Sequence, residues 1–169
     1  MILTHDVIVR EIASGRLVID PLDPDQIGPA SIDLHLGDEI RVMQGGPPVI
    51  DIDEATDYRS VTEVRPLVEP YVLQPGETIH GITRERIKLP PDIGGWLEGR
   101  SRYARLGLMI HVTSGFVQPG VDNRQVLEMS NVAGRPLAIR AGTRLLQIVL
   151  QRTEGQATYA GRFADQQRP

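Results

Sequence analysis

The residues best suited to chemistry lie within residues 99–131, in the stretch GRSRYARLGLMIHVTSGFVQPGVDNRQVLEMSN. At its start, Arg100, Ser101 and Arg102 supply two guanidinium groups and a hydroxyl on a backbone that glycine makes flexible. Arginine suits phosphate because its planar fork can donate two parallel hydrogen bonds. Residues 103–106 can form a helical turn whose N-terminal amides also face an anion. The alternative is a charged surface turn, which is the commoner role of an isolated GRSR sequence.

Glu128 is the single carboxylate of the predicted strand QVLEMS. On a strand, Val126, Glu128 and Ser130 share one face, and Leu127 and Met129 share the other. A lone carboxylate at such a position usually points to solvent. In a pocket, loss of hydration would raise its pKa and prepare it for proton transfer. The periodicity leaves both alternatives open.

The chain between these two segments adds a histidine and a loop. His111 stands alone in its predicted strand, where a histidine is more often a hydrogen-bonded structural residue than a ligand. The loop SGFVQPG, at residues 114–120, is bounded by glycine and proline. Such a loop can bring backbone amides and carbonyls close to the flat edge of a ligand, or it can be an ordinary hairpin connection.

The elements that must position these residues are short strands. Several apolar runs alternate with period two, and 13 prolines and 17 glycines separate them. This pattern predicts a mainly β sandwich or barrel. One short helix is expected at residues 4–14, capped by Thr4 and ended by Gly15. Residues 44–70 are expected to form a surface excursion, and residues 155–169 a polar tail without an apolar period.

Length and composition restrict the function further. A chain of 169 residues suggests one domain with a real core. The net charge of -4 gives no electrostatic case for binding a nucleic-acid polymer. The absence of cysteine excludes disulfides, thiolate catalysis and zinc sites built on cysteine, and no histidine or carboxylate lies at metal-ligand spacing beside His111. Charged residues interrupt the apolar N-terminus, so we expect a cytoplasmic protein without a membrane span.

Taken together, the chain resembles the dCTP deaminase family, which is related to the trimeric dUTPases. The likeness begins with MIL at residues 1–3 and continues through GRLVIDP and QIGPASIDL. It is strongest in residues 99–131, where the family pattern reads GRSS-x-x-R-x-G-L, H-x-T-A-G-x-I-D-P-G and L-E-x-x-N. It ends in GRFADQ at residues 161–166, which is similar to the family's G-K-Y-x-x-Q tail.

The resemblance implies a distorted antiparallel β-barrel of the dUTPase-like (β-clip) type. Residues 1–169 would form one domain, with residues 155–169 as a mobile tail that closes over the nucleotide. The protein would be a homotrimer with active sites between subunits. Glu128 falls on the family's catalytic glutamate, which takes a proton from the water that attacks C4 of cytosine and delivers protons to N3 and the leaving amine. Ser101 and Arg105 fall on the residues that hold this water and the glutamate.

The resemblance also implies a set of nucleotide-binding residues, with Arg162 in place of the usual lysine. The set comprises Arg100, Arg102, His111, Val112, Thr113, Gln118, Tyr159, Arg162 and Gln166. Deamination on this pattern needs no cofactor, and Mg²⁺ is expected only as an ion bound together with the triphosphate of the substrate. Zinc cytidine deaminases use an H-x-E and P-C-x-x-C constellation, which a chain without cysteine does not supply.

Departures from the family pattern bear on the product. Arg102 replaces the second serine of GRSS, and Gln118 replaces the aspartate of I-D-P-G. Glutamine can hydrogen-bond a sugar hydroxyl, but it cannot be the base that activates water for cleavage of the phosphate chain. We therefore expect conversion of dCTP to dUTP and ammonia, supplying dUTP for thymidylate synthesis. The alternatives are a dUTP diphosphatase, a bifunctional deaminase that forms dUMP, and a non-catalytic nucleotide-binding regulator.

Overall fold

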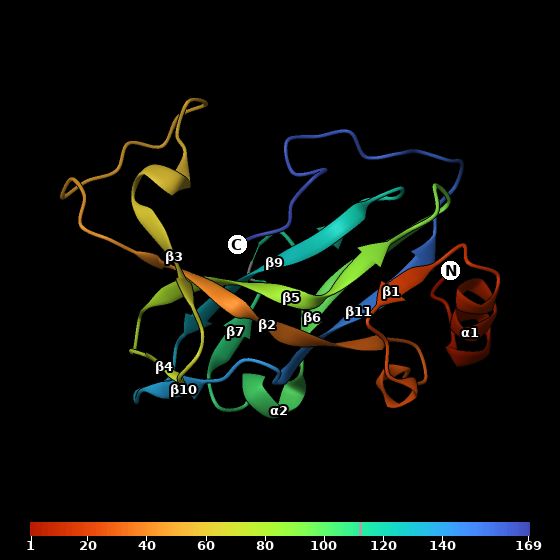
Figure 1. Cartoon of the computed structure of the whole chain (residues 1–169), viewed down its shortest axis with the longest axis horizontal. Coiled ribbons are helices and arrows are strands. Elements are labelled where there is room, and N and C mark those ends of the chain that lie inside the picture. Colours follow the sequence, from red (N-terminus) through yellow and green to blue (C-terminus); the bar gives the residue numbers. More distant parts are fainter. Residues whose placement is uncertain (112) are drawn as a thin grey trace.

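The computed structural model describes residues 1–111 and 113–169, and antiparallel strands make up most of it (Figure 1). The elements in chain order are α1 (His5–Ala13), β1 (Val18–Asp20), the 3₁₀ turn η1 (Pro24–Gln26), β2 (Ile32–Met43), the 3₁₀ turn η2 (Tyr58–Ser60), β3 (Thr62–Pro66), β4 (Tyr71–Leu73), β5 (Thr78–Lys88), β6 (Ile93–Gly99), α2 (Ser101–Ala104), β7 (Leu108–Ile110), β8 (Phe116–Val117), β9 (Asp122–Asn131), β10 (Leu137–Ile139) and β11 (Arg144–Arg152).

The strands form a nine-stranded sheet and a separate pair. Neighbours in the large sheet follow the order β7-β9-β5-β2-β11-β6-β8, β1 also pairs with β5, and β3 with β2. All of these pairs are antiparallel, as is the pair of β10 with β4. Register shifts interrupt β2–β5 and β5–β9, and irregularities of this kind bend strands. The prediction of a mainly β, antiparallel, barrel-like fold is confirmed.

The core lies on one face of the curled sheet, and strand alternation decides which residues enter it. Ile32, Leu34 and Leu36 of β2 are fully buried. In β9, Leu127 and Met129 are also fully buried, whereas Glu128 is only half-buried on the opposite face. The alternation predicted for this strand is therefore present, and Glu128 points away from the core.

The predicted N-terminal helix is confirmed as α1. Thr4 occupies its N-cap position, but its hydroxyl donates to Asp6 at 2.7 Å instead of accepting from the helix backbone. Gly15 follows the helix with a φ of 71°, a left-handed conformation that glycine adopts without strain. Among the described residues, no helix has both the length and the apolar character needed to cross a bilayer.

Two irregular segments frame the region that carries Glu128. The surface excursion expected at residues 44–70 is present only over residues 44–61, which project from the sheet with Val49 and Ile52 largely exposed (Figure 1). The prediction was wrong for residues 62–66, which form β3 and pair with β2. The C-terminal tail, drawn in blue, turns back across the sheet toward β9 (Figure 1). Close approach of the tail requires Gly120, because a Cβ there would lie 2.7 Å from the Cα of Thr158.

Candidate active site

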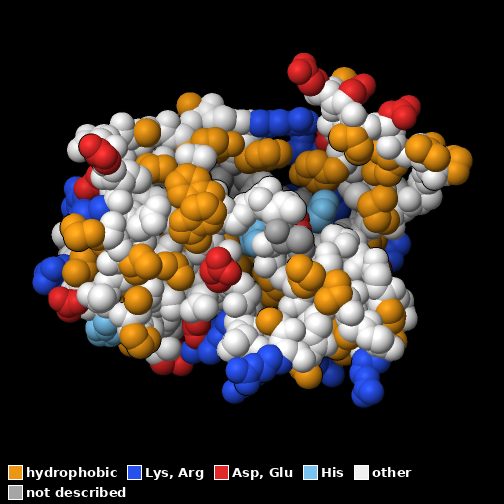
Figure 2. All heavy atoms as spheres, turned by 180° about the vertical axis from the view of Figure 1, so that it is seen from behind, with side chains coloured by type: hydrophobic (Ala, Val, Ile, Leu, Met, Phe, Trp, Pro, Cys, Tyr) orange, Lys and Arg blue, Asp and Glu red, His pale blue; other side chains and the backbone are white. Residues whose placement is uncertain are grey.

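A cavity of about 550 Å³ lies between β5, β9, the loop before β9 and the C-terminal tail. Figure 2 shows a face of the molecule on which a hollow lies among hydrophobic side chains, with histidine side chains beside it. The polar and aromatic residues that line the cavity include Tyr58, His80, His111, Gln118, Asn123, Gln125, Glu128, Tyr159, Phe163 and Gln166. Within the described part of the chain, Glu128 is the single carboxylate of this lining.

Strand pairing places Glu128 at the centre of this wall. The register sets Glu128 of β9 opposite His80 of β5, and the backbone N–H of His111 donates to the Glu128 carbonyl at 3.0 Å. The Glu128 side chain is 32% exposed, and burial raises its pKa above the ordinary glutamate value. A backbone hydrogen bond from Thr113 opposes this rise. Of the two alternatives that periodicity allows, Glu128 therefore takes the pocket and not open solvent.

His111 follows β7 in an unusual conformation, with a φ of 53°. Its side chain is 5% exposed, and burial lowers the pKa of its imidazole to about 4. Its Nδ1 lies 3.9 Å from a carboxylate oxygen of Glu128. Because the imidazole is neutral at neutral pH, this contact leaves the charge of Glu128 unpaired.

The tail closes one side of the cavity by pairing with the start of β9. Tyr159 donates its backbone N–H to the Pro119 carbonyl at 3.0 Å. Arg124 donates its backbone N–H to the Gln166 carbonyl at 3.2 Å, and Gln166 Nε2 donates back to the Arg124 carbonyl at 3.0 Å. Tyr159 and Gln166 therefore line the cavity as residues of a docked segment.

Other predicted site residues lie outside this cavity. Arg162 lines an adjoining depression with Arg41 and Arg59 and pairs with Asp57 at 3.4 Å. Ser101, Arg102 and Arg105 are exposed on or beside α2, and none of them lines the Glu128 cavity. A single chain therefore does not bring Ser101 and Arg105 to Glu128. Val112 lies outside the described residues.

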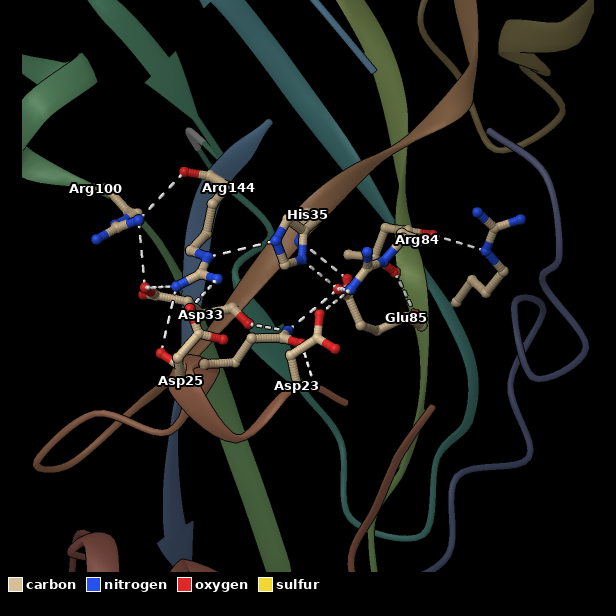
Figure 3. Close-up of polar contacts among 11 residues, drawn as sticks. Asp23, Asp25, Asp33, His35, Arg84, Glu85, Arg100 and Arg144 are labelled. Carbon is tan, nitrogen blue, oxygen red and sulfur yellow. Dashed lines mark hydrogen bonds and ion pairs between the residues drawn. The ribbon is translucent and has the colours of Figure 1, made fainter. Parts of the chain in front are cut away.

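A polar network holds the predicted phosphate turn from behind (Figure 3). Arg100 pairs with Asp33 at 3.2 Å, and Arg144 lies 3.8 Å from the same carboxylate. Arg144 Nε also donates to His35 Nε2 at 3.3 Å, so His35 carries its proton on Nδ1. That Nδ1 donates at 2.6 Å to Glu85, which is fully buried. The network thereby connects Arg100 to the centre of the sheet.

The cavity lining also contains residues that the sequence did not single out, chiefly Tyr58, His80 and Phe163. The signal for His80 was a polar side chain in an apolar alternating strand, which is the same signal that identified Glu128. Tyr58 and Phe163 lie in irregular segments, where no periodicity marks a face. Their place in the cavity depends on how these segments fold back onto the sheet.

The family resemblance predicts Mg²⁺ only together with the bound triphosphate. No group of three or more histidine and acidic side chains suited to a metal converges within residues 1–111 and 113–169. Mg²⁺ usually binds through one or two carboxylates together with substrate phosphates. The cavity offers one carboxylate, so the ligands of a nucleotide-bound Mg²⁺ would come mainly from the triphosphate. That expectation stays a prediction.

Comparison with known proteins extends across most of the chain. A family model described as dCTP deaminase-like matches residues 2–153. A "dCTP deaminase, dUMP-forming" of Acidothermus cellulolyticus is 38% identical, with 100% of this chain and 93% of the relative covered. A protein with the same description from Parafrankia sp. is 40% identical, with coverage of 100% and 88%. A "dCTP deaminase" of Halorubrum lacusprofundi is 38% identical, with coverage of 93% and 80%.

Solved structures agree with the fold. The 2'-deoxycytidine 5'-triphosphate deaminase of Agrobacterium tumefaciens is 26% identical and superposes with a TM-score of 0.69 over 90% of this chain. This chain spans 48% of that solved chain. A dUTPase of Staphylococcus bacteriophage 80alpha is 14% identical and superposes with a TM-score of 0.53, and this likeness extends only to the fold. The sequence blocks, the curled sheet and the family match lead to one conclusion: the chain belongs to the dCTP deaminase-like family and has the dUTPase-like fold.

Proposed function

We propose that this protein hydrolytically deaminates the cytosine base of dCTP. The observation that carries the proposal is Glu128, the single carboxylate lining a nucleotide-sized cavity in the described chain, with its pKa raised by burial. A base poised closer to neutral pH transfers protons more effectively than an ordinary exposed carboxylate. Membership of the dCTP deaminase-like family and the descriptions of the relatives support the same reaction.

The reaction follows from a carboxylate beside C4 of the base. Glu128 accepts a proton from water while the water oxygen bonds to C4, and it passes that proton to N3. The second proton of the added oxygen then goes to the exocyclic amine, the C4–N bond breaks and ammonia leaves. Uracil results, with all atoms balanced as cytosine plus water gives uracil plus ammonia. General acid–base transfer of this kind typically contributes about 10²- to 10⁴-fold in rate.

We also propose that the complete site needs a second subunit. Ser101 and Arg105, which the family pattern places around the attacking water, lie outside the cavity of their own chain. A homotrimer with sites between subunits would bring these residues from one subunit to Glu128 of another. The Arg100 turn, held by Asp33 and Arg144, would then present its guanidinium groups to the phosphates.

The end product has two candidates, dUTP and dUMP. Two of the relatives described above are named dUMP-forming, which favours dUMP and pyrophosphate over the dUTP expected from the sequence. Gln118 lies in the cavity lining where the family has aspartate, and it supplies no base for the second hydrolysis. A dUMP-forming protein would therefore use Glu128, or a carboxylate from outside this cavity, to activate the water that attacks the α-phosphorus.

The proposal is tested with Glu128→Gln, which removes the base and keeps the shape of the side chain. Ammonia release from dCTP is expected to fall by at least about 100-fold, while dCTP binding stays measurable by calorimetry. Glu69→Gln, at an exposed carboxylate outside the cavity lining, is the matched control. Full turnover in Glu128→Gln would refute the mechanism. Binding without turnover in the wild type would favour the non-catalytic regulator. Mass spectrometry of the wild-type products separates dUTP from dUMP.

A further inference from the structure

His80 occupies the middle of a row of residues that crosses three strands. The register pairs Arg41 of β2 with His80 of β5, and His80 with Glu128 of β9. Directly opposed residues of antiparallel strands lie on the same face, with Cβ atoms about 4.5–5.5 Å apart. Both His80 and Glu128 line the cavity. The imidazole is therefore the cross-strand neighbour of the proposed base.

The ring of His80 contacts Tyr58 of η2, and one arginine of β2 and one of η2 flank Tyr58 in turn. Tyr58 of η2 meets it edge-on, with ring centroids 5.5 Å apart and planes at 76°. The guanidinium carbons of Arg41 and Arg59 each lie 5.4 Å from the centroid of the Tyr58 ring. Burial, and next the charge of Arg41, lower the pKa of His80, so the imidazole is neutral at neutral pH. A neutral imidazole has one donor nitrogen and one acceptor nitrogen.

The surroundings of the ring decide which nitrogen carries the proton. Nδ1 of His80 is buried and has no hydrogen-bond partner in the part of the chain that the structure describes. An orphaned buried N–H is rarer in proteins than an acceptor with an unused lone pair. The proton therefore resides on Nε2, on the opposite edge of the ring. The described contacts include no hydrogen bond between His80 and Glu128, and both side chains border the cavity, where a water molecule can lie between them.

We propose that His80 is a positioning residue of this site, whose Nε2–H donates to the oxygen of the water that Glu128 deprotonates. This inference rests on the proposed function. A water held in this way gives one proton to Glu128, accepts a hydrogen bond from His80 on one lone pair, and directs its other lone pair at C4. A neutral imidazole suits this role because an imidazolium would stabilise the Glu128 carboxylate and weaken it as a base.

Three substitutions separate the hydrogen bond from the shape of the ring. His80→Gln places an amide N–H near the position of Nε2, His80→Asn places one near Nδ1, and His80→Leu offers none. We expect His80→Asn and His80→Leu to lower kcat for ammonia release by about 10- to 100-fold, with KM for dCTP within about threefold of wild type. His80→Gln is expected to keep at least about a third of the wild-type kcat. The acid limb of the pH profile should not move in any of them, because Glu128 remains the base.

The alternative is that His80 only supports the local packing. Substitution of Tyr58, which packs against the ring, and thermal unfolding curves of the variants test it. Tyr58→Ala removes the edge-on contact and should lower kcat, whereas Glu69→Gln, at an exposed carboxylate outside the cavity lining, should leave it unchanged. Wild-type kcat in both His80→Asn and His80→Leu would overturn the inference, and so would losses that are equal in all three His80 variants and follow a loss of thermal stability. A wild-type protein that binds dCTP and releases no ammonia would overturn the proposed function, and the role of His80 with it. If the wild type is active and the His80 substitutions leave its kcat unchanged, only the role of His80 is overturned.

Discussion

Glu128 gains its chemical character from neighbours that do not pair with its charge. One neighbouring ionisable group, His111, is buried and neutral, because its pKa lies at about 4. His80 on the other side is neutral for the same reason, burial. Within residues 1–111 and 113–169 no arginine or lysine pairs with this carboxylate, so loss of hydration dominates and raises the pKa of Glu128. A residue that is unremarkable by type thereby becomes suited to accept a proton.

The pH dependence of the reaction follows from this arrangement. The proposed deamination needs Glu128 deprotonated, and burial raises its folded-state pKa above the ordinary glutamate value of 4.5, so kcat/KM should fall as the pH drops through that raised pKa. The pKa of His111 is lower, at about 4, so its titration does not set the position of the acid limb of the kcat/KM profile. The measurement is kcat/KM for dCTP between roughly pH 4 and pH 9. An acid limb centred below 4.5 would contradict the assignment of Glu128.

Gln118 lines the cavity, and substitutions at this position test whether a carboxylate there supports the proposed second hydrolysis. If dUMP formation depends on a carboxylate at this position, Gln118→Asp should raise pyrophosphate release by about 10-fold or more, since it restores a possible base in the cavity lining. Gln118→Asn, which changes the length without adding a charge, is the control. Equal pyrophosphate release by wild type, Gln118→Asn and Gln118→Asp would show that another group activates that water.

At the scale of elements, the site depends on strands that a buried polar network ties together. Glu85 of β5 accepts hydrogen bonds from the backbone N–H and from Nδ1 of His35 in β2, and from the Gln26 side chain in η1. His35 in turn contacts Arg144 of β11 (Figure 3). The network joins three strands and η1 behind the turn that carries Arg100. Its hydrogen bonds compensate for the burial of a carboxylate.

Removal of Glu85 should therefore be costly. Glu85→Ala leaves the backbone N–H of His35 and the amide of Gln26 without their acceptor, and it should lower the free energy of unfolding by about 3 kcal/mol. Urea unfolding measures this change. Glu63→Ala, at a largely solvent-accessible pair with Arg65, should cost less than about 1 kcal/mol. Similar small losses in both variants would show that the network contributes little to stability.

At the scale of the whole molecule, one chain holds the proposed base but not its proposed partners. Glu128 lies in the cavity, while Ser101 and Arg105 are exposed at α2. A heterologous interface in a closed ring can join one surface of a subunit to a different surface of the next. The proposed homotrimer would bring Ser101 and Arg105, which lie outside the Glu128 cavity of their own chain, to the cavity of a neighbouring subunit.

Mixed assemblies test this arrangement directly. Glu128→Gln and Ser101→Ala subunits should each be nearly inactive alone. When unfolded together in equal amounts and refolded, they should recover about a quarter of the wild-type activity, because that fraction of sites combines an intact Glu128 with an intact Ser101 from its neighbour. Light scattering should give a mass about three times that of the chain. No recovery in mixtures that form trimers would mean that both residues serve the same subunit's site.

The sequence by itself determined the class of fold and the identity of the proposed base. Period-two alternation and frequent turn residues encode strands locally, and residue order in separated blocks shows the family resemblance. The same alternation assigned Glu128 to one face of its strand, but it did not show whether that face is exposed to solvent or lines a pocket. Only the tertiary structure decided that this face forms a cavity and that His80 lies opposite Glu128.

The tertiary structure also decided that the tail pairs with β9 and that Ser101 and Arg105 lie outside the cavity that contains Glu128. The physical reason is that strand register and the docking of irregular segments depend on contacts between residues far apart in the sequence. No periodicity within a single segment specifies such contacts. Glu128 was therefore identifiable from its neighbours in the sequence, whereas its chemical surroundings were set by residues that only folding brings to it.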